Sequence, residues 1–153
     1  MSTLKNKHWF AHPADLRHDR RMRRAMSDFP NGVGYGLIVL LIEHLRCQPN
    51  YSYPLQDLDL LAKEFETSLP ILQTLITKYG FFEIIENEKE ELFISPMLND
   101  LMKPYDEKVE KNRLAGIKSA EKRKEKIQKL LVEAKKQDKK LDYLDVDEIP
   151  DVV

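Results

Sequence analysis

The chain has 153 residues, which is long enough for one domain with a core and an appendage but too short for two ordinary domains. Its single cysteine, Cys47, excludes an intramolecular disulfide framework and a cysteine-rich zinc site. The first ten residues contain no apolar run typical of a signal peptide, and the most apolar stretch, residues 33–45, falls short of the ~20 residues that span a bilayer. We therefore expect a cytoplasmic protein with no membrane partner.

A formal net charge of −1 conceals strong segregation of charge along the chain. Residues 1–24 carry +5 and residues 111–140 carry +8, whereas residues 55–110 carry −8 and the last thirteen residues carry −5. Two basic blocks on either side of an acidic centre suit a polyanion such as DNA, and they equally suit the acidic surface of a neighbouring subunit. Charge alone does not decide between these partners.

Apolar periodicity and turn residues predict the elements in chain order. Asp19 is a suitable N-cap for a helix that runs to about residue 27, and Pro30 and Gly32 separate it from a strongly apolar helix that ends near residue 46. The glycines at the start of this second helix, Gly34 and Gly36, indicate close packing against another backbone. A short extended piece over residues 50–55 and a helix over residues 55–66 follow. A further helix over residues 68–80 has Pro70 in its first turn, and residues 81–95 form a hairpin.

The order helix, helix, strand, helix, helix, hairpin is that of a winged helix-turn-helix with an additional N-terminal helix. We therefore predict a mainly α fold with a small β-hairpin over residues 1–103, in which the fourth helix occupies the recognition position. Residues 104–140 are predicted to form a basic extension, helical or disordered, with Pro104 as a potential interruption. Residues 141–153 have the composition of an acidic flexible tail.

Several segments of the first hundred residues resemble a known domain: WFAHPADLRHDRRMRRAM, GVGYGLIVLLIEHLR, YPLQDLDLLAKEF, KYGFFEI and LFISPML. In these segments the chain resembles the Lin1244/Lin1753-type N-terminal domain of phage and prophage replication-initiation proteins, which is similar to DnaD-like replisome organisers. His12 and Asp19 keep their places in the family pattern, while Arg20 stands where proline is usual. The segment NRLAGIKSAEKRK resembles the basic stretch that commonly follows this domain. The resemblance implies a winged-helix domain associated with DNA replication.

Candidate catalytic and metal-binding groups are few. The N-terminal histidines suggest a metal cluster, but Pro13 argues against a regular helix that presents them, and no cysteine assists. The carboxylates of the third helix lie opposite its apolar face without a Ser, His or Lys constellation, and no glycine-rich phosphate loop is present. The suggested metal cluster comprises His8, His12, His18 and Asp19, and the carboxylates of the third helix are those of Asp57, Asp59 and Glu64. We expect a protein that is not an enzyme and uses no cofactor, metal or small-molecule substrate.

The segment DLRHDRRMRRAM, residues 15–26, holds five arginines in twelve positions. Arginine suits bidentate pairing with phosphate or carboxylate, although it is also a good helix former and favours a solvated helix face. If the protein binds DNA, we expect these arginines and the basic extension to supply most of the affinity through phosphate contacts, with little reading of bases by the fourth helix. The predicted DNA-contacting residues are Arg17, Arg20, Arg21, Arg24, Gln73, Thr74, Thr77, Lys78, Arg113, Lys118, Lys122 and Arg123.

The predicted hairpin is too acidic for a wing that touches DNA, because a phosphate backbone repels it. Its charged residues are Glu83, Glu86, Glu88, Glu90 and Glu91 against Lys89. The competing prediction is therefore an interaction or assembly module of a phage or plasmid replisome, with a second copy or a replisome protein as partner, in which Arg20, Arg21 and Arg24 meet the glutamates of the wing. A transcriptional regulator is a third interpretation, which the fold alone supports.

Overall fold

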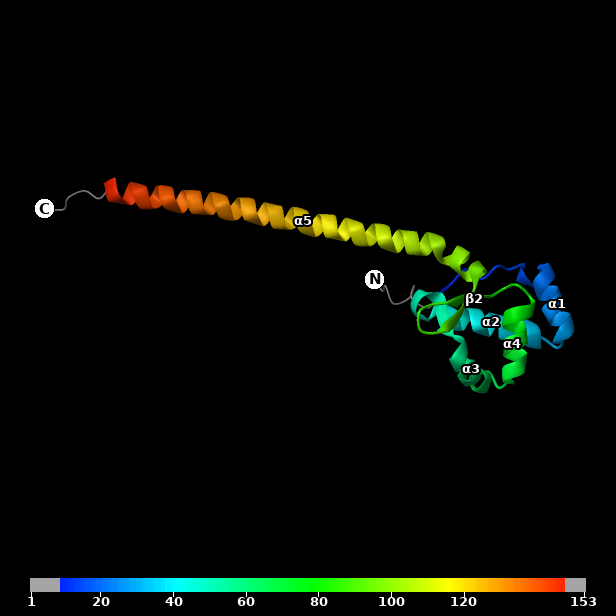
Figure 1. The fold of residues 1–153 in the computed structure, drawn as a ribbon. Helices are drawn as coiled ribbons and strands as arrows, with labels where there is room; N and C mark the ends of the chain where they lie inside the picture. Colours follow the sequence, from blue (N-terminus) through cyan, green and yellow to red (C-terminus); the bar gives the residue numbers. More distant parts are fainter. Residues whose placement is uncertain (1–8, 148–153) are drawn as a thin grey trace. The chain divides into compact units, whose positions relative to one another are not determined.

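Figure 1 shows a computed structural model of the protein, which describes the backbone of residues 9–147 and the side chains of residues 9–139. The chain forms two compact units, which we call unit 1 (Met1–Pro104) and unit 2 (Tyr105–Val153). The helices are α1 (Arg20–Asp28), α2 (Val33–Arg46), α3 (Leu58–Glu64), α4 (Leu69–Lys78) and α5 (Pro96–Asp147), and the strands are β1 (Ser52–Pro54), β2 (Glu83–Glu86) and β3 (Glu91–Ile94). The predicted fold class is confirmed: a mainly α winged helix-turn-helix with an additional N-terminal helix and a long C-terminal extension.

Helix α1 begins where the sequence predicts it, after the N-cap residue Asp19. The Asp19 carboxylate accepts a hydrogen bond from the backbone N–H of Arg21 at 2.8 Å, which satisfies one of the free donors at the helix start. The helix buries Met22 and Ala25 completely. The opposite side of α1, which carries most of its arginines, remains exposed.

Helices α1 and α2 approach each other closely at Gly34. A Cβ atom on Gly34 would lie 2.5 Å from the carbonyl oxygen of Ala25, so only glycine fits between the two backbones. Nothing lies within 4 Å of a Cβ built on Gly36. The prediction of close backbone packing is therefore confirmed for Gly34 and wrong for Gly36.

The core of unit 1 lies between the helices and one face of the sheet. Fully buried leucines from α2 and α4, among them Leu41 and Leu72, pack beneath the fully buried rings of Phe81 and Phe93. Phe93, in the central strand, makes edge-on contacts with Tyr53 and Phe82 at ring-centroid distances of 6.0 and 5.9 Å. These contacts join β3 to β1 and to the residue before β2.

The sheet has three antiparallel strands in the order β1-β3-β2. Phe93 of β3 pairs with Tyr53 on one side and with Ile84 on the other. Strand β2 is therefore an outer strand, and all four of its residues are exposed. At the tip, the Asn87 side chain accepts hydrogen bonds from the backbone N–H groups of Lys89 and Glu90 at 2.9 and 2.8 Å. We call β2, β3 and this tip the wing.

Helix α5 begins after Ser95, whose hydroxyl accepts a hydrogen bond from the backbone N–H of Leu98 at 3.2 Å. Its first turns bury Leu98 and Met102 in unit 1. The helix passes through Pro104, so the predicted interruption is wrong; the carbonyl that Pro104 leaves without a partner belongs to exposed Asp100, where water reaches it. α5 continues through residues 141–147 of the predicted tail, and the last six residues lie outside the described part of the chain.

Candidate nucleic-acid interface

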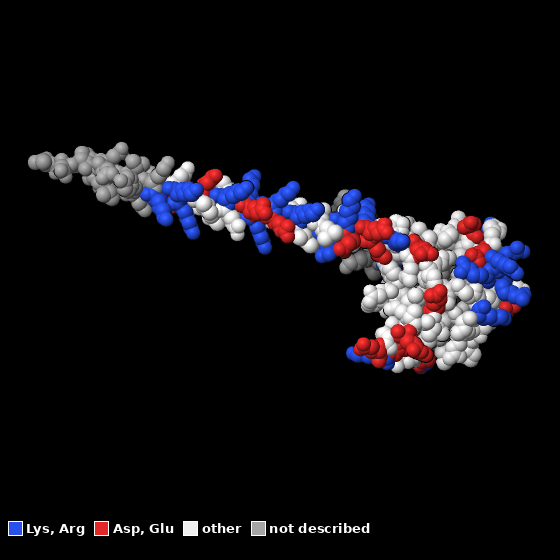
Figure 2. Space-filling model, turned by 45° about the horizontal axis from the view of Figure 1, so that its top comes forward, with Lys and Arg blue, Asp and Glu red and all other residues white. Residues whose placement is uncertain are grey.

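The most basic concave surface of unit 1 lies between α1 and the C-terminal end of α4. It is an open hollow of about 570 Å³, which we call the arginine hollow. Figure 2 shows Lys and Arg side chains gathered over this side of the unit. The hollow is lined by Arg20, Arg21, Arg23, Arg24, Ser27, Lys78 and Tyr79. Three predicted arginines of α1 and one predicted lysine of α4 therefore meet at one surface.

Arg21 has a structural role within this surface. Its guanidinium donates two hydrogen bonds to the Asp19 carboxylate at 3.1 and 3.0 Å and a third to the Gly80 carbonyl oxygen at 3.1 Å. The same group lies 4.3 Å from the centroid of the Phe81 ring, a distance typical of a cation–π contact. Arg21 thus joins the start of α1 to the turn after α4, and its predicted contact with a DNA phosphate stays a prediction.

Replacing Arg21 with glutamine is expected to lower the free energy of unfolding by about 1 kcal/mol, a value kept small because the side chain is 43% exposed. The effect should depend on pH, because the Arg21 hydrogen bond holds the pKa of Asp19 below its ordinary value of 3.8. A depressed carboxyl pKa stabilises the fold above the ordinary value, and this stabilisation is lost as the pH falls through the folded-state pKa.

Chemical denaturation at pH 7 and pH 3 measures this effect, and Arg24→Gln is the matched control. Arg24 lies on the same helix, and its side chain forms no hydrogen bond or ion pair with residues 9–139, so its replacement should change stability by less than about 0.5 kcal/mol. Equal stability of the two variants at pH 7 would contradict the structural role of Arg21.

Lys78 also has a partner inside unit 1. Its ammonium group lies 3.0 Å from Oδ2 of Asp28, and the Tyr79 hydroxyl donates a hydrogen bond to the same oxygen at 2.7 Å. These two hydrogen bonds, first that of Tyr79, lower the pKa of Asp28; burial and the Asp28 carboxylate raise the pKa of Tyr79 to about 12. The Asp28 carboxylate is therefore satisfied by Lys78 and Tyr79, as that of Asp19 is by Arg21, and the remaining arginines give the hollow a positive character.

The free cations of the hollow are Arg20, Arg23 and Arg24. They are exposed, and their guanidiniums form no hydrogen bond or ion pair with any residue in the range 9–139. Arg23 was missing from the predicted set, although it also lines a neighbouring hollow of about 380 Å³ with Arg17 and Met26. The signal was available, because positions 20, 23, 24 and 27 follow the i, i+3, i+4, i+7 pattern of one helix face.

The predicted contact residues of α4 offer little to a base edge. The hydroxyls of Thr74 and Thr77 donate hydrogen bonds to the carbonyl oxygens of Pro70 and Gln73 in their own helix, at 2.9 and 2.8 Å. With Lys78 paired to Asp28, Gln73 is the member of the predicted α4 set whose side chain forms no hydrogen bond or ion pair with residues 9–139. Little base reading from α4 stays a prediction.

The predicted residues of α5 divide into two kinds. Arg113 forms an ion pair with Glu110 at 2.6 Å, which lowers the pKa of the glutamate. Lys118, Lys122 and Arg123 are exposed and pair with none of the described side chains. At 3.6 residues per turn, a set of five lysines falls within about 40° around the helix axis, and Arg123 lies outside it. This lysine stripe consists of Lys111, Lys118, Lys122, Lys129 and Lys136.

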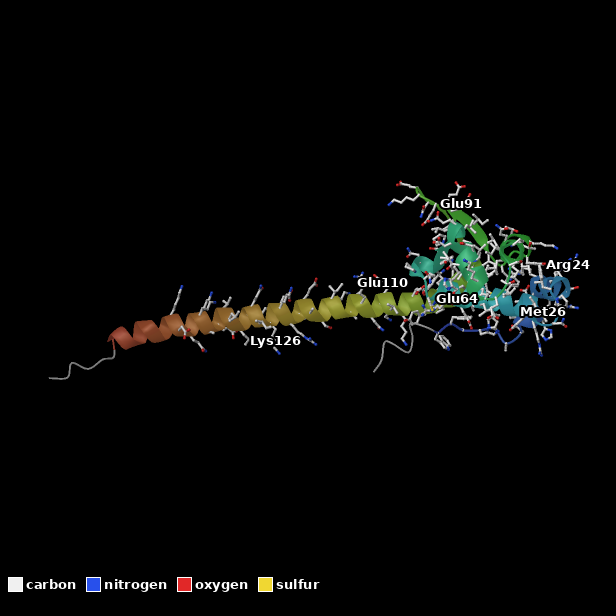
Figure 3. All side chains as sticks on the ribbon, turned by 90° about the horizontal axis from the view of Figure 1, so that it is seen from below. Arg24, Met26, Glu64, Glu91, Glu110 and Lys126 are labelled. Atoms are coloured by element: carbon white, nitrogen blue, oxygen red, sulfur yellow. The ribbon has the colours of Figure 1, made fainter. Side chains whose placement is uncertain are left out.

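The acidic wing lies on another side of unit 1 from the arginine hollow. Figure 2 shows acidic side chains gathered away from the arginines, and Figure 3 shows Arg24 and Glu91 on separate sides of the unit. None of the ion pairs found among residues 9–139 joins α1 to the wing. The predicted contact of Arg20, Arg21 and Arg24 with wing glutamates is therefore not formed within one copy of unit 1.

Of the N-terminal histidines, His8 lies outside the described residues. His12 bonds to the Tyr35 hydroxyl at 2.8 Å, and no group of three or more potential metal ligands occurs among the residues that the structure describes. No helix within residues 9–147 combines the length and apolar character needed to cross a membrane. Comparisons with protein-family models, curated proteins and solved structures find no match for this chain.

Proposed function

We propose that the chain is a cytoplasmic DNA-associated protein of the replication-initiation or replication-accessory type, which binds the phosphate backbone. One observation carries this proposal: Arg20, Arg23 and Arg24 surround an open hollow and leave their guanidiniums without a partner among residues 9–139. Guanidinium groups bind phosphate oxygens in a bidentate manner, which makes an arginine-lined surface suitable for a nucleic-acid backbone. The link to phage or plasmid replication comes from the sequence resemblance.

The orientation on DNA follows from the charges of unit 1. A duplex attracted by the arginine hollow lies beside the C-terminal end of α4, whose side chains offer few groups for reading bases. The wing, with five glutamates against one lysine, stays away from the phosphates. Such a contact positions the protein on DNA without specifying a sequence, which supports a replication role over that of a sequence-specific transcriptional regulator.

The test is a set of duplex DNA titrations at several salt concentrations with a variant that carries Arg20→Gln, Arg23→Gln and Arg24→Gln. If each arginine neutralises one phosphate, the slope of log affinity against log salt should become shallower by about 2.7, that is, 0.9 for each of the three contacts. The loss of affinity should be similar for unrelated duplex sequences, because phosphate contacts carry no sequence information.

A matched control removes the same charge elsewhere on unit 1. Lys63, Lys89 and Lys103 are all exposed and lie outside the residues that line the arginine hollow, so their joint replacement by glutamine should leave the salt slope nearly unchanged. An equal effect of the two triple variants would mean that net charge, and not the hollow, determines binding. No binding of DNA by the unaltered chain at low salt would overturn the proposed function.

A further inference from the structure

Unit 1 carries two surfaces of opposite charge, and each keeps several charged side chains that form no ion pair with any side chain in the range 9–139. One is the arginine hollow and the other is the wing, on separate sides of the unit (Figures 2 and 3). We propose that the wing of one copy docks into the arginine hollow of a second copy, so that the protein associates head to tail. DNA then competes for the same guanidiniums, and this last step alone rests on the proposed function.

The wing presents its carboxylates without neutralising partners. Glu83, Glu86, Glu88 and Glu91 are exposed, and none forms an ion pair with a side chain in the range 9–139. Glu86 and Glu91 lie directly opposite each other in the β2–β3 ladder. Like charges in such a cross-strand pair destabilise a sheet. An external cation that contacts both carboxylates removes this repulsion, and a pair of arginines is well suited to do so.

The wing tip is held by hydrogen bonds within the turn and to a neighbouring segment. The Asn87 side chain binds two backbone N–H groups of the turn, and the Asn87 N–H itself donates to the Glu90 carbonyl oxygen at 3.1 Å. Outside the turn, the amide of Gln56 donates a hydrogen bond to the Glu90 carboxylate at 2.9 Å. A tip held in this way loses little conformational freedom when it binds, so more of the electrostatic attraction remains as affinity.

The two surfaces match in apolar character as well as in charge. Ile84 and Ile85 of the outer strand are 46% and 38% exposed, next to the glutamates. On the other side, half-buried Met26 lines the neighbouring hollow beside Arg23, and Tyr79, of which only 6% is exposed, lines the arginine hollow itself. Successive side chains of a strand point to opposite faces, and Ile84 is the isoleucine that shares a face with Glu86. Burial of Ile84 against Met26 adds a contribution that salt does not screen.

The arrangement determines the kind of assembly. Because the wing and the hollow lie on separate sides of unit 1, a copy that docks its wing into a second copy does not turn its own hollow toward that copy's wing. The contact is then heterologous, so every copy that uses its wing still has a free hollow, and every copy that uses its hollow still has a free wing. Association therefore continues into a ring or a chain and does not stop at a pair. Phosphates of DNA bind the same arginines, so DNA dissociates these contacts when it occupies the hollow.

The test uses two full-length variants, each of which keeps one surface. The hollow variant carries Arg20→Gln, Arg23→Gln and Arg24→Gln, and the wing variant carries Glu86→Gln, Glu88→Gln and Glu91→Gln. In sedimentation velocity at low salt, the unaltered chain should grow in mass with concentration, whereas each variant alone should stay monomeric. An equal mixture of the two should form a 1:1 complex and nothing larger, because only one wing and one hollow remain to pair.

Two further measurements separate docking from general charge effects. Glu121→Gln, Glu125→Gln and Glu133→Gln remove the same charge from exposed positions of α5, and this variant should associate like the unaltered chain. The wing variant should unfold at a temperature no lower than that of the unaltered chain, because it loses the Glu86–Glu91 repulsion. Loss of association in the wing variant is then not a result of unfolding.

Several outcomes would overturn the head-to-tail contact. They are an unaltered chain that stays monomeric at every concentration, association that persists in either variant alone, a mixture that fails to form the 1:1 complex, and equal weakening by the α5 control. Addition of duplex DNA to the 1:1 complex should release the wing variant's partner. If DNA binds the complex without releasing this partner, DNA does not compete for the hollow. If the 1:1 complex forms but no form of the chain binds DNA, the docking stands and the proposed function is rejected.

Discussion

Replacing Gly34 with alanine is expected to destabilise unit 1 by about 3 kcal/mol, a large share of the stability of a small domain. The added Cβ atom would lie 2.5 Å from the carbonyl oxygen of Ala25 and 2.9 Å from its carbonyl carbon. Because both atoms belong to the backbone, no side-chain rotation relieves the contact, and α1 must move away from α2. Chemical denaturation of the variant and the unaltered chain measures the loss.

Gly36→Ala is the matched control for this experiment. The same methyl group meets no atom within 4 Å at position 36, which lies in the same helix two residues further on. Alanine is the better helix former, so this variant should be more stable than the unaltered chain by about 0.5–1 kcal/mol. Opposite signs for the two variants support the described packing of α1 on α2, and a stable Gly34→Ala variant would contradict it.

Replacing Lys118, Lys122 and Lys129 together with glutamine is expected to weaken DNA binding by on the order of 100-fold at 0.1 M salt. These three residues belong to the lysine stripe of α5, where spacings of four and seven residues place the side chains on one side of the helix. A straight row of cations on a helix follows a phosphate backbone better than scattered charges do. The slope of log affinity against log salt should become shallower by about 2.7.

The same helix supplies a control of equal charge. Lys124, Lys135 and Lys139 are exposed and lie about 80–140° away from the middle of the stripe. Their replacement by glutamine should have a clearly smaller effect on affinity and on the salt slope. Equal effects of the two triple variants would show that α5 contributes only its net charge, and an unchanged affinity in both would show that α5 takes no part in DNA binding.

Local sequence signals predicted the helices and the hairpin well. Asp19 as an N-cap, Pro30 and Gly32 as a break and Pro70 in a first turn act within a few residues of the chain, and the structure places helix boundaries at each of them. The pairing of β1 with β3 was not predicted. It joins residues about forty positions apart, such as Tyr53 and Phe93, and therefore depends on how distant segments pack. Pro104 misled the prediction because a proline weakens a helix without always ending it, and the carbonyl oxygen that it leaves without a donor belongs to an exposed residue, Asp100.

The candidate site was predicted as a region, and its individual roles were not. Sequence position indicated a basic α1, but five arginines of one segment are equivalent until their neighbours are known. Arg21 differs from Arg20 because Gly80 and Phe81, about sixty residues later, lie within reach of its guanidinium. Lys78 was predicted as a free contact, yet it pairs with Asp28 across fifty residues.

The amino-acid sequence by itself determined the fold class, the order of elements and the separation of the chain into basic and acidic blocks. These properties depend on periodicity, capping and composition, which act locally and do not require knowledge of the packing. The tertiary structure alone decided which charges are available. Whether a guanidinium or carboxylate faces solvent or a partner depends on contacts between distant segments, as the bound Arg21 and the free Arg23, two residues apart on α1, show.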